Sequence, residues 1–140
     1  MKCSVDCFCH IASFEGLKFD AYQDSGGVWT IGYGHTKGVK KGDHVHYGQA
    51  GKLLVEDVES AEKALPNVKN LTQGNIDALT DFIFNVGASR FKSSTLYKKI
   101  MKNSKDPSIK DEFLRWVYCN HIKVEGLVRR RTWESERYYE

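Results

Sequence analysis

The chain has 140 residues, 41% of them hydrophobic, and its 21 Lys and Arg exceed its 18 Asp and Glu to leave a net charge of +3. That length suits one domain, or one domain made of two lobes, and the hydrophobic share suffices for a packed core. The positive excess favours an anionic partner only weakly and is far below that of a dedicated nucleic-acid binder. No apolar run approaches the ~18 residues that a membrane-spanning helix needs. We therefore expect a folded chain that neither binds nucleic acid nor spans a membrane.

The N-terminal stretch MKCSVDCFCHIASFEG lacks the continuous apolar core of a secretory signal, because Asp6, His10 and Glu15 interrupt it. We expect the protein either to stay in the cytoplasm until it is released or to have lost a leader. The sequence leaves both routes open.

Three of the four cysteines, Cys3, Cys7 and Cys9, crowd at the N-terminus, far from Cys119. They lack the paired CxxC spacing of a strong zinc site, so we expect no metal. Most of them are expected to be free thiols on the first helix. A bridge from one of them to Cys119 stays open.

The first predicted element is a helix of about ten residues that begins near Asp6 and ends at Gly16. From Lys18 to about Tyr47, glycines recur between β-forming residues, which is typical of a small β segment. Within it, Asp24-Ser-Gly-Gly27 is a turn signal between two short strands. In the first predicted helix, near Asp6 to Gly16, apolar side chains recur at i, i+4 and i+7: Cys7, Ile11 and Phe14.

Helical periodicity returns after Gly48. The helix that begins there has an apolar stripe opposed by acidic residues, and it is a natural connector between two lobes. Thr72 is predicted to cap the next helix, and Ser94 or Thr95 to begin a short one.

Asp106 and Pro107 fit a helix cap followed by proline at the first helical position, and a last helix opens near Gly126. This order of elements predicts an α+β fold with a small β-containing lobe and a larger helical lobe. The expected parts are the β-containing lobe at about 13–48, the connecting helix at about 49–66, and the helical lobe at about 67–140 with the helix at 6–15 packing near it.

Two carboxyl groups in the N-terminal third are placed in contrasting environments. Glu15 ends a helix, where the helix dipole disfavours a charged carboxylate, as a general acid requires. Asp24 lies in a polar, glycine-flanked turn where water and backbone amides favour a carboxylate. Such a contrast is typical of acid–base glycoside cleavage. Thr30, six residues after Asp24 on the returning strand, is placed to hold a water molecule in the same cleft.

The spacing alone also fits a purely structural interpretation. Carboxylates nine residues apart are common, and Glu-Gly or Asp-Ser-Gly-Gly are ordinary cap and turn signals. These residues alone therefore leave both the catalytic and the structural interpretation open.

The stretch from Glu15 to His35 resembles the active-site motif of the phage-type lysozymes, the family of phage muramidase endolysins. Three elements stand at the family's spacing: Glu15-Gly16, Tyr22-Gln-Asp24 and Thr30-Ile-Gly-Tyr-Gly-His35. The resemblance runs from about residue 13 to the C-terminus through two further stretches. One is Ala78–Gly87 followed by Phe91–Leu96, and the other is Phe113–Tyr118 with Gly126–Arg131 and Glu134.

The resemblance implies a lysozyme-like fold and cleavage of the β-1,4 bond between N-acetylmuramic acid and N-acetylglucosamine in peptidoglycan. Glu15 would protonate the leaving oxygen, Asp24 would assist attack by water from the other side, and Thr30 would orient that water. An inverting route of this kind needs the carboxyls ~6.5–9.5 Å apart. No cofactor is implied, and we expect a monomer that acts on the glycan strand after release from the host cytoplasm to the cell wall.

Two alternatives stay open. A lytic transglycosylase would need only Glu15 and would make an anhydro sugar, and an inactive relative would bind the wall on the same scaffold. The presence of Asp24 and Thr30 favours the hydrolase over both. The biological role, whether phage lysis, bacterial competition or defence, is not readable from the residues.

Tyr22, Asn85 and His35 are the candidate substrate-binding residues. Tyr22 is placed to stack on a sugar, whereas Trp29 and Tyr33 are better explained as core of the β lobe. His35, in a loop after glycine, is expected to support the structure by hydrogen bonding rather than to catalyse or bind a metal.

Asn85 fits either a substrate hydrogen bond from the helical lobe or a cap at its helix end before Gly87. Arg129–Arg131 alternate with acids and are typical of a solvated helix face. The resemblance implies that one of them pairs with Glu15, and the spacing leaves open which. His44 and His46 share one strand face and are expected to be exposed polar residues rather than metal ligands.

Overall fold

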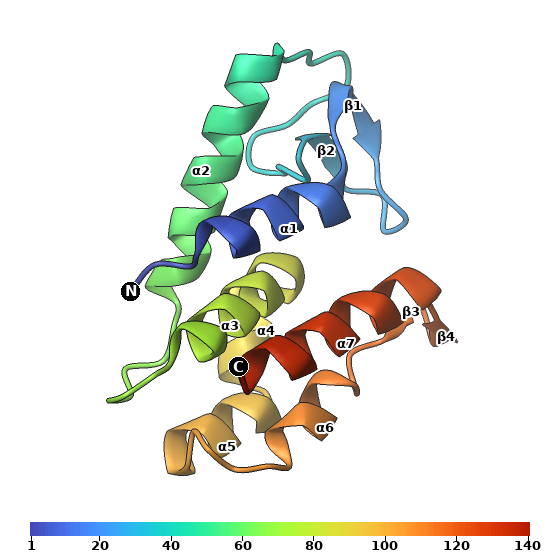
Figure 1. Ribbon diagram of the computed structural model, residues 1–140. Coiled ribbons are helices and arrows are strands. Elements are labelled where there is room, and N and C mark those ends of the chain that lie inside the picture. The colour runs from blue at the N-terminus through green and yellow to red at the C-terminus, as the bar shows by residue number, and fades with distance from the viewer. The chain divides into compact units, whose positions relative to one another are not determined.

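The computed structural model describes residues 1–140, which form seven helices and two antiparallel two-stranded sheets (Figure 1). The predicted α+β class is confirmed. The helices are α1 (Val5–Glu15), α2 (Tyr47–Lys63), α3 (Gln73–Val86), α4 (Ala88–Lys92), α5 (Thr95–Lys102), α6 (Ile109–Phe113) and α7 (Glu125–Tyr138). The strands are β1 (Lys18–Gln23), β2 (Trp29–Gly32), β3 (Tyr118–Cys119) and β4 (Ile122–Lys123).

The chain forms two compact units, which we call the β unit (residues 8–60) and the helical unit (residues 1–7 with 61–140). Their boundaries fall within α1 and α2, whereas the sequence suggested divisions near 48 and 66. Most of the first helix therefore belongs to the β unit. No helix combines the length and apolar character that crossing a membrane requires.

In the β unit, the first helix ends where the sequence predicts. Gly16 adopts a φ of 69°, a left-handed conformation that suits glycine, and its N–H donates to the Ala12 carbonyl at 3.0 Å. The chain then reverses into β1, which pairs with β2 in the register Tyr22 opposite Thr30. The small core of this unit consists of buried apolar side chains: Ile11, Ile31, Ala50, Leu54 and Val58.

In the helical unit, α3 is the central helix and runs beside α7 (Figure 1). Thr72 caps it as predicted, in a reciprocal capping box with Asn75. The Phe82 ring on α3 makes edge contacts with three aromatic rings of the core. The fully buried apolar side chains around it are Ala78, Leu79, Phe91, Leu96, Ile100, Ile109, Phe113 and Tyr138.

The predicted helix start at Asp106 and Pro107 is wrong by two residues. Asp106 Oδ1 accepts from the Ser108 N–H and hydroxyl, both at 2.8 Å, and the Asp106 carbonyl accepts from Ile109 N. The aspartate therefore caps a turn over residues 107–108, and α6 begins only at Ile109. An Asp-Pro signal is the same for a turn and for a helix start, so it could not separate them.

All four cysteines are free thiols, and no bridge joins Cys119 to the N-terminal group. Cys7 is buried and its thiol donates to the Asp77 carbonyl at 3.3 Å. The prediction of free thiols on the first helix is confirmed for Cys7 and Cys9, whereas Cys3 precedes the helix.

Asp77 on α3 ties residues 1–7 to the helical unit. It is fully buried and accepts from the Ser4 N–H at 2.7 Å, the Ser4 hydroxyl at 2.6 Å and Arg137 Nη2 at 2.6 Å. Ser4 Oγ in turn accepts from Cys7 N and caps α1. Burial opposes the charge of Asp77, but the bonds from Ser4, Arg137 and Gln73 outweigh it and lower the pKa below its ordinary value of 3.8.

Replacing Asp77 with Asn is expected to lower the stability at neutral pH by about 2–4 kcal/mol, because Arg137 loses its buried partner. A lowered folded-state pKa means that the unfolded chain binds this proton more readily. The contribution of Asp77 is therefore complete above its ordinary pKa and fades as the pH falls through the folded value. Thermal unfolding of both proteins from about pH 7 to about pH 3 should show their difference shrinking. A difference independent of pH would contradict this account.

Candidate active site

Glu15 lies at the C-terminal end of α1 with its side chain half-buried in the β unit. Its carboxyl group packs directly on the backbone of Gly34, in the loop after β2. A Cβ atom at Gly34 would overlap Glu15 Oε1 and lie 3.0 Å from its Cδ. Gly34 also has a φ of 75°. The position therefore requires glycine for both conformation and space.

The loop that carries Gly34 is held at both ends. Ile31 and His35 exchange backbone hydrogen bonds of 2.9 Å, so that residues 32–34 form a tight reversal. His35 Nδ1 is 2.8 Å from Asp57 Oδ2 on α2, and His35 Nε2 is 2.9 Å from the Lys37 carbonyl. Both ring nitrogens thus have protein partners, and through them His35 helps to fix the loop that supports Glu15. A contact between His35 and the substrate stays a prediction.

Asp24 occupies the turn between β1 and β2, as predicted. Its Oδ1 accepts from the backbone N–H groups of Gly26 and Val28, each at 2.9 Å. Its own N–H donates to the Val28 carbonyl at 2.9 Å, and its carbonyl accepts from Gly27 N at 2.9 Å. The side chain is exposed, and the two backbone N–H groups hold its Oδ1 in place.

Thr30 is buried on β2, and only 4% of it is exposed. Its hydroxyl donates to the Val28 carbonyl at 2.9 Å. Because that bond uses the hydroxyl hydrogen, the oxygen can still accept a hydrogen bond from another group. The backbone of Val28 thus links Asp24 and Thr30, a connection that the sequence pattern did not reveal.

Tyr22 on β1 lies opposite Thr30 on β2 in the strand register. Burial raises the pKa of Tyr22, and the negative charges of Glu15 and Asp24 raise it further. Its phenol is therefore within electrostatic range of both carboxylates. Four of the predicted site residues, Glu15, Tyr22, Asp24 and Thr30, share one region of the β unit.

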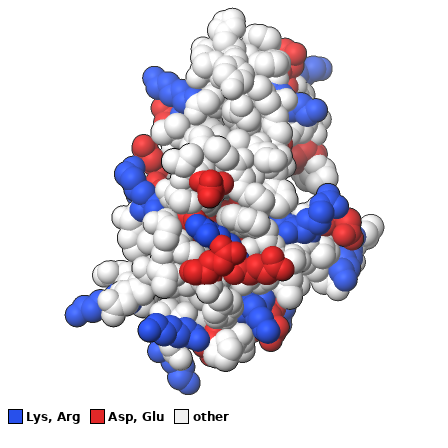
Figure 2. Space-filling view, in the orientation of Figure 1, with Lys and Arg blue, Asp and Glu red and all other residues white.

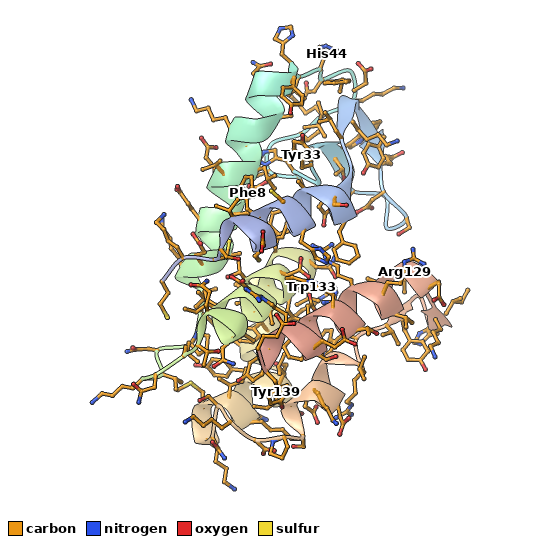
Figure 3. The ribbon with its side chains drawn as sticks, viewed as in Figure 1. Phe8, Tyr33, His44, Arg129, Trp133 and Tyr139 are labelled. Atoms are coloured by element: carbon orange, nitrogen blue, oxygen red, sulfur yellow. The ribbon has the colours of Figure 1, made fainter.

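Trp29 and Tyr33 are half-buried, as expected of residues that help to build the small β lobe. Tyr33 follows β2 and lies beside α2 (Figure 3). Burial and the neighbouring Tyr47 raise the pKa of Tyr33. The structural role predicted for these two rings fits their burial.

Asn85, near the end of α3, does not cap its helix. Its Oδ1 accepts from Arg131 Nη2 on α7, and the end of α3 is closed instead by the Gly87 N–H, which donates to the Ile83 carbonyl at 2.8 Å. The capping interpretation is wrong, because Arg131 takes the side-chain oxygen. The residue as a whole is exposed.

The arginine run of α7 is only partly a solvated face. Arg129 is exposed, but Arg130 and Arg131 are buried, so that prediction is wrong for two of the three. Arg130 pairs with Asp81 at 2.9 Å, and Arg131 pairs with Glu134 at 2.5 Å. Figure 2 shows blue and red side chains close together on the drawn face rather than in separate fields. That one of the three arginines pairs with Glu15 stays a prediction.

The fold and the carboxyl pair define a lysozyme-like protein. The muramidase domain of SpmX from Asticaccaulis excentricus superposes with a TM-score of 0.85 and 32% identity, over 99% of this chain and 98% of that domain. The endolysin of Acyrthosiphon pisum secondary endosymbiont phage 1 is 39% identical over 133 residues, 89% of each chain. The endolysin of Salmonella phage P22 is 34% identical over 139 residues, 94% of each chain.

The family model described as phage lysozyme matches residues 12–134. The chain therefore belongs to the phage lysozyme family and is a peptidoglycan-cleaving enzyme of that family.

Proposed function

We propose that this protein is a muramidase that hydrolyses the β-1,4 bond between N-acetylmuramic acid and N-acetylglucosamine with inversion at the anomeric carbon. One observation carries the proposal. The carboxyl groups of Glu15 and Asp24 lie in the same region of the β unit, beside Tyr22, and Asp24 is linked to Thr30 through the Val28 backbone.

In the proposed reaction, one carboxyl group acts as the general acid and the other as the general base. Glu15 gives a proton to the leaving glycosidic oxygen as the bond between that oxygen and the anomeric carbon breaks. Asp24 takes a proton from a water molecule, and the bonds from Gly26 and Val28 to its Oδ1 hold the carboxylate in place. The oxygen of that water then forms the new bond to the anomeric carbon. An inverting route requires the carboxyls to be ~6.5–9.5 Å apart, so that this water fits between substrate and base.

Thr30 is proposed to orient the water. Its hydroxyl hydrogen is committed to the Val28 carbonyl, so its oxygen can only accept. A water that donates one hydrogen to Thr30 and the other to Asp24 keeps a lone pair directed at the sugar. Tyr22, one third exposed beside both carboxylates, is the proposed sugar-contacting ring. Asn85 is proposed to contact the substrate only through its amide hydrogens, because Arg131 occupies its oxygen.

The products of peptidoglycan digestion test this mechanism. Purified sacculi digested with the protein and analysed by mass spectrometry should yield muropeptides with a hydrated reducing end, and NMR of the fresh products should show the α-anomer. Digestion with Glu15→Gln protein is the control and should yield none. Anhydro-muropeptides as the main product would identify a lytic transglycosylase instead. No products, with retained binding to sacculi, would identify a wall-binding protein.

The proposed partner is the glycan strand alone, and the proposed acting form is a monomer without cofactor. The expected place of action is the cell wall, after release of the protein from the host cytoplasm.

A further inference from the structure

The short hairpin between α6 and α7 carries a left-handed turn with histidine at its second position. β3 and β4 pair as Tyr118 opposite Lys123 and Cys119 opposite Ile122, which leaves a two-residue turn. Those two residues, Asn120 and His121, have φ values of 50° and 66°. Positive φ at both positions is typical of a type I′ turn, for which Asn-Gly is the favoured pair.

The second turn position holds an imidazole where glycine would be easier. Asparagine tolerates the left-handed conformation, but a residue with a full side chain pays a backbone cost there that glycine does not. This backbone conformation at a residue with a full side chain motivates the hypothesis of a role outside the turn itself.

The three side chains at this tip share a cavity and have no partners in the protein. An open depression of about 610 Å³ is lined by Tyr118, Asn120 and His121. Tyr118 is 60% exposed, and both turn residues are exposed as well. None of the three side chains makes a hydrogen bond, an ion pair or a ring contact within the chain. Their hydrogen-bonding groups are therefore all available to a ligand.

The chemistry of the depression fits a sugar ring. The face of an aromatic ring stacks on the apolar face of a pyranose, while the tyrosine hydroxyl, the amide and the imidazole can both donate and accept. N-acetylated hexosamines present hydroxyl and acetamido groups that match such a set. An anionic ligand would be expected to need a cation in the lining. Arg129 lies at the same end of α7 (Figure 3) but does not line the depression.

We propose that Tyr118, Asn120 and His121 form a glycan-binding subsite on the helical unit that takes an N-acetylhexosamine ring of the peptidoglycan strand. The identity of this ligand rests on the proposed muramidase function. The subsite binds through stacking and neutral hydrogen bonds, so it holds a sugar rather than the charged peptide stem.

Titration of ¹⁵N-labelled Glu15→Gln protein with an N-acetylglucosamine tetrasaccharide tests the subsite without cleavage. Amide signals of residues 118–123 are expected to shift and saturate. Tyr118→Ala should weaken this binding about tenfold, since it removes the stacking ring. Ile122→Ala alters an equally exposed side chain of the same hairpin that does not line the depression, and it should leave the affinity unchanged. Arg129→Gln should leave it unchanged as well.

His121→Gly separates a ligand role from a folding role. Glycine should relieve the left-handed strain and raise the melting temperature, while the tetrasaccharide affinity falls several-fold. Unshifted signals at 118–123, an undiminished affinity of His121→Gly, or loss of binding in Arg129→Gln would each overturn the subsite. If wild-type protein cleaves sacculi but the amide signals of residues 118–123 do not shift, the subsite alone is refuted. Protein that binds the sugar at the hairpin but cleaves nothing refutes the hydrolase alone.

Discussion

Replacing Glu15 with Gln is expected to abolish lysis of bacteria whose outer membrane has been permeabilised, while the fold stays intact. The amide has nearly the same shape as the carboxyl group and can keep the packing on Gly34, but it has no acidic proton to give to the leaving oxygen. General acid catalysis contributes about 10²–10⁴-fold to such a reaction. A turbidity assay measures the loss, and circular dichroism with a melting curve reports the fold.

The matched control is Glu56→Gln, which makes the same chemical change at an exposed position of α2 in the same unit. It should lyse cells at the wild-type rate. Lysis by Glu15→Gln at that rate would show that Glu15 is not the acid and would end the proposed mechanism.

Replacing Gly34 with Ala is expected to lower the lytic rate by about 10²-fold or more, although residue 34 has no chemistry of its own. The added methyl group would occupy the space of the Glu15 carboxyl, so one of the two must move. A misplacement of about 1 Å in a catalytic group can cost about 10²-fold in rate. The φ of 75° adds a backbone penalty of about 1 kcal/mol for any residue with a Cβ.

Gly38→Ala controls for that backbone penalty. Gly38 has a similar φ of 72°, but nothing lies within 4 Å of the position of its added methyl group. Both variants should lose similar stability in thermal unfolding, and only Gly34→Ala should lose lytic activity. Equal lytic rates in the two variants would show that the contact between Gly34 and Glu15 does not position the acid.

Several features could be predicted because their signals are local. The stop at Gly16, the cap at Thr72 and the turn at Asp24 each involve backbone hydrogen bonds between residues no more than four apart. Such bonds depend on side-chain type at fixed offsets, which can be read directly from the residues. The contrast between Glu15 at a helix end and Asp24 in a polar turn has the same local origin.

Other features followed from contacts between residues distant in the chain. His35 is separated from Asp57 by 22 residues, and Arg131 from Asn85 by 46 residues. The predictions that failed on the cap role of Asn85 and on the solvated face of the arginine run concerned side chains with partners on another element: Asn85 with Arg131, and Arg130 with Asp81. No offset along the sequence indicates such a partner.

By itself, the sequence determined the α+β class, the helix end at Gly16, the cap at Thr72 and the turn at Asp24, and it singled out two carboxyls and a threonine as candidates. Only the tertiary structure decided that Gly34 supports Glu15, that Val28 joins Asp24 to Thr30, and that two arginines of α7 are buried against acids. The physical reason is that backbone capping is satisfied within a turn or two of chain. Buried polar side chains, in contrast, take whichever partner the packed elements bring within reach.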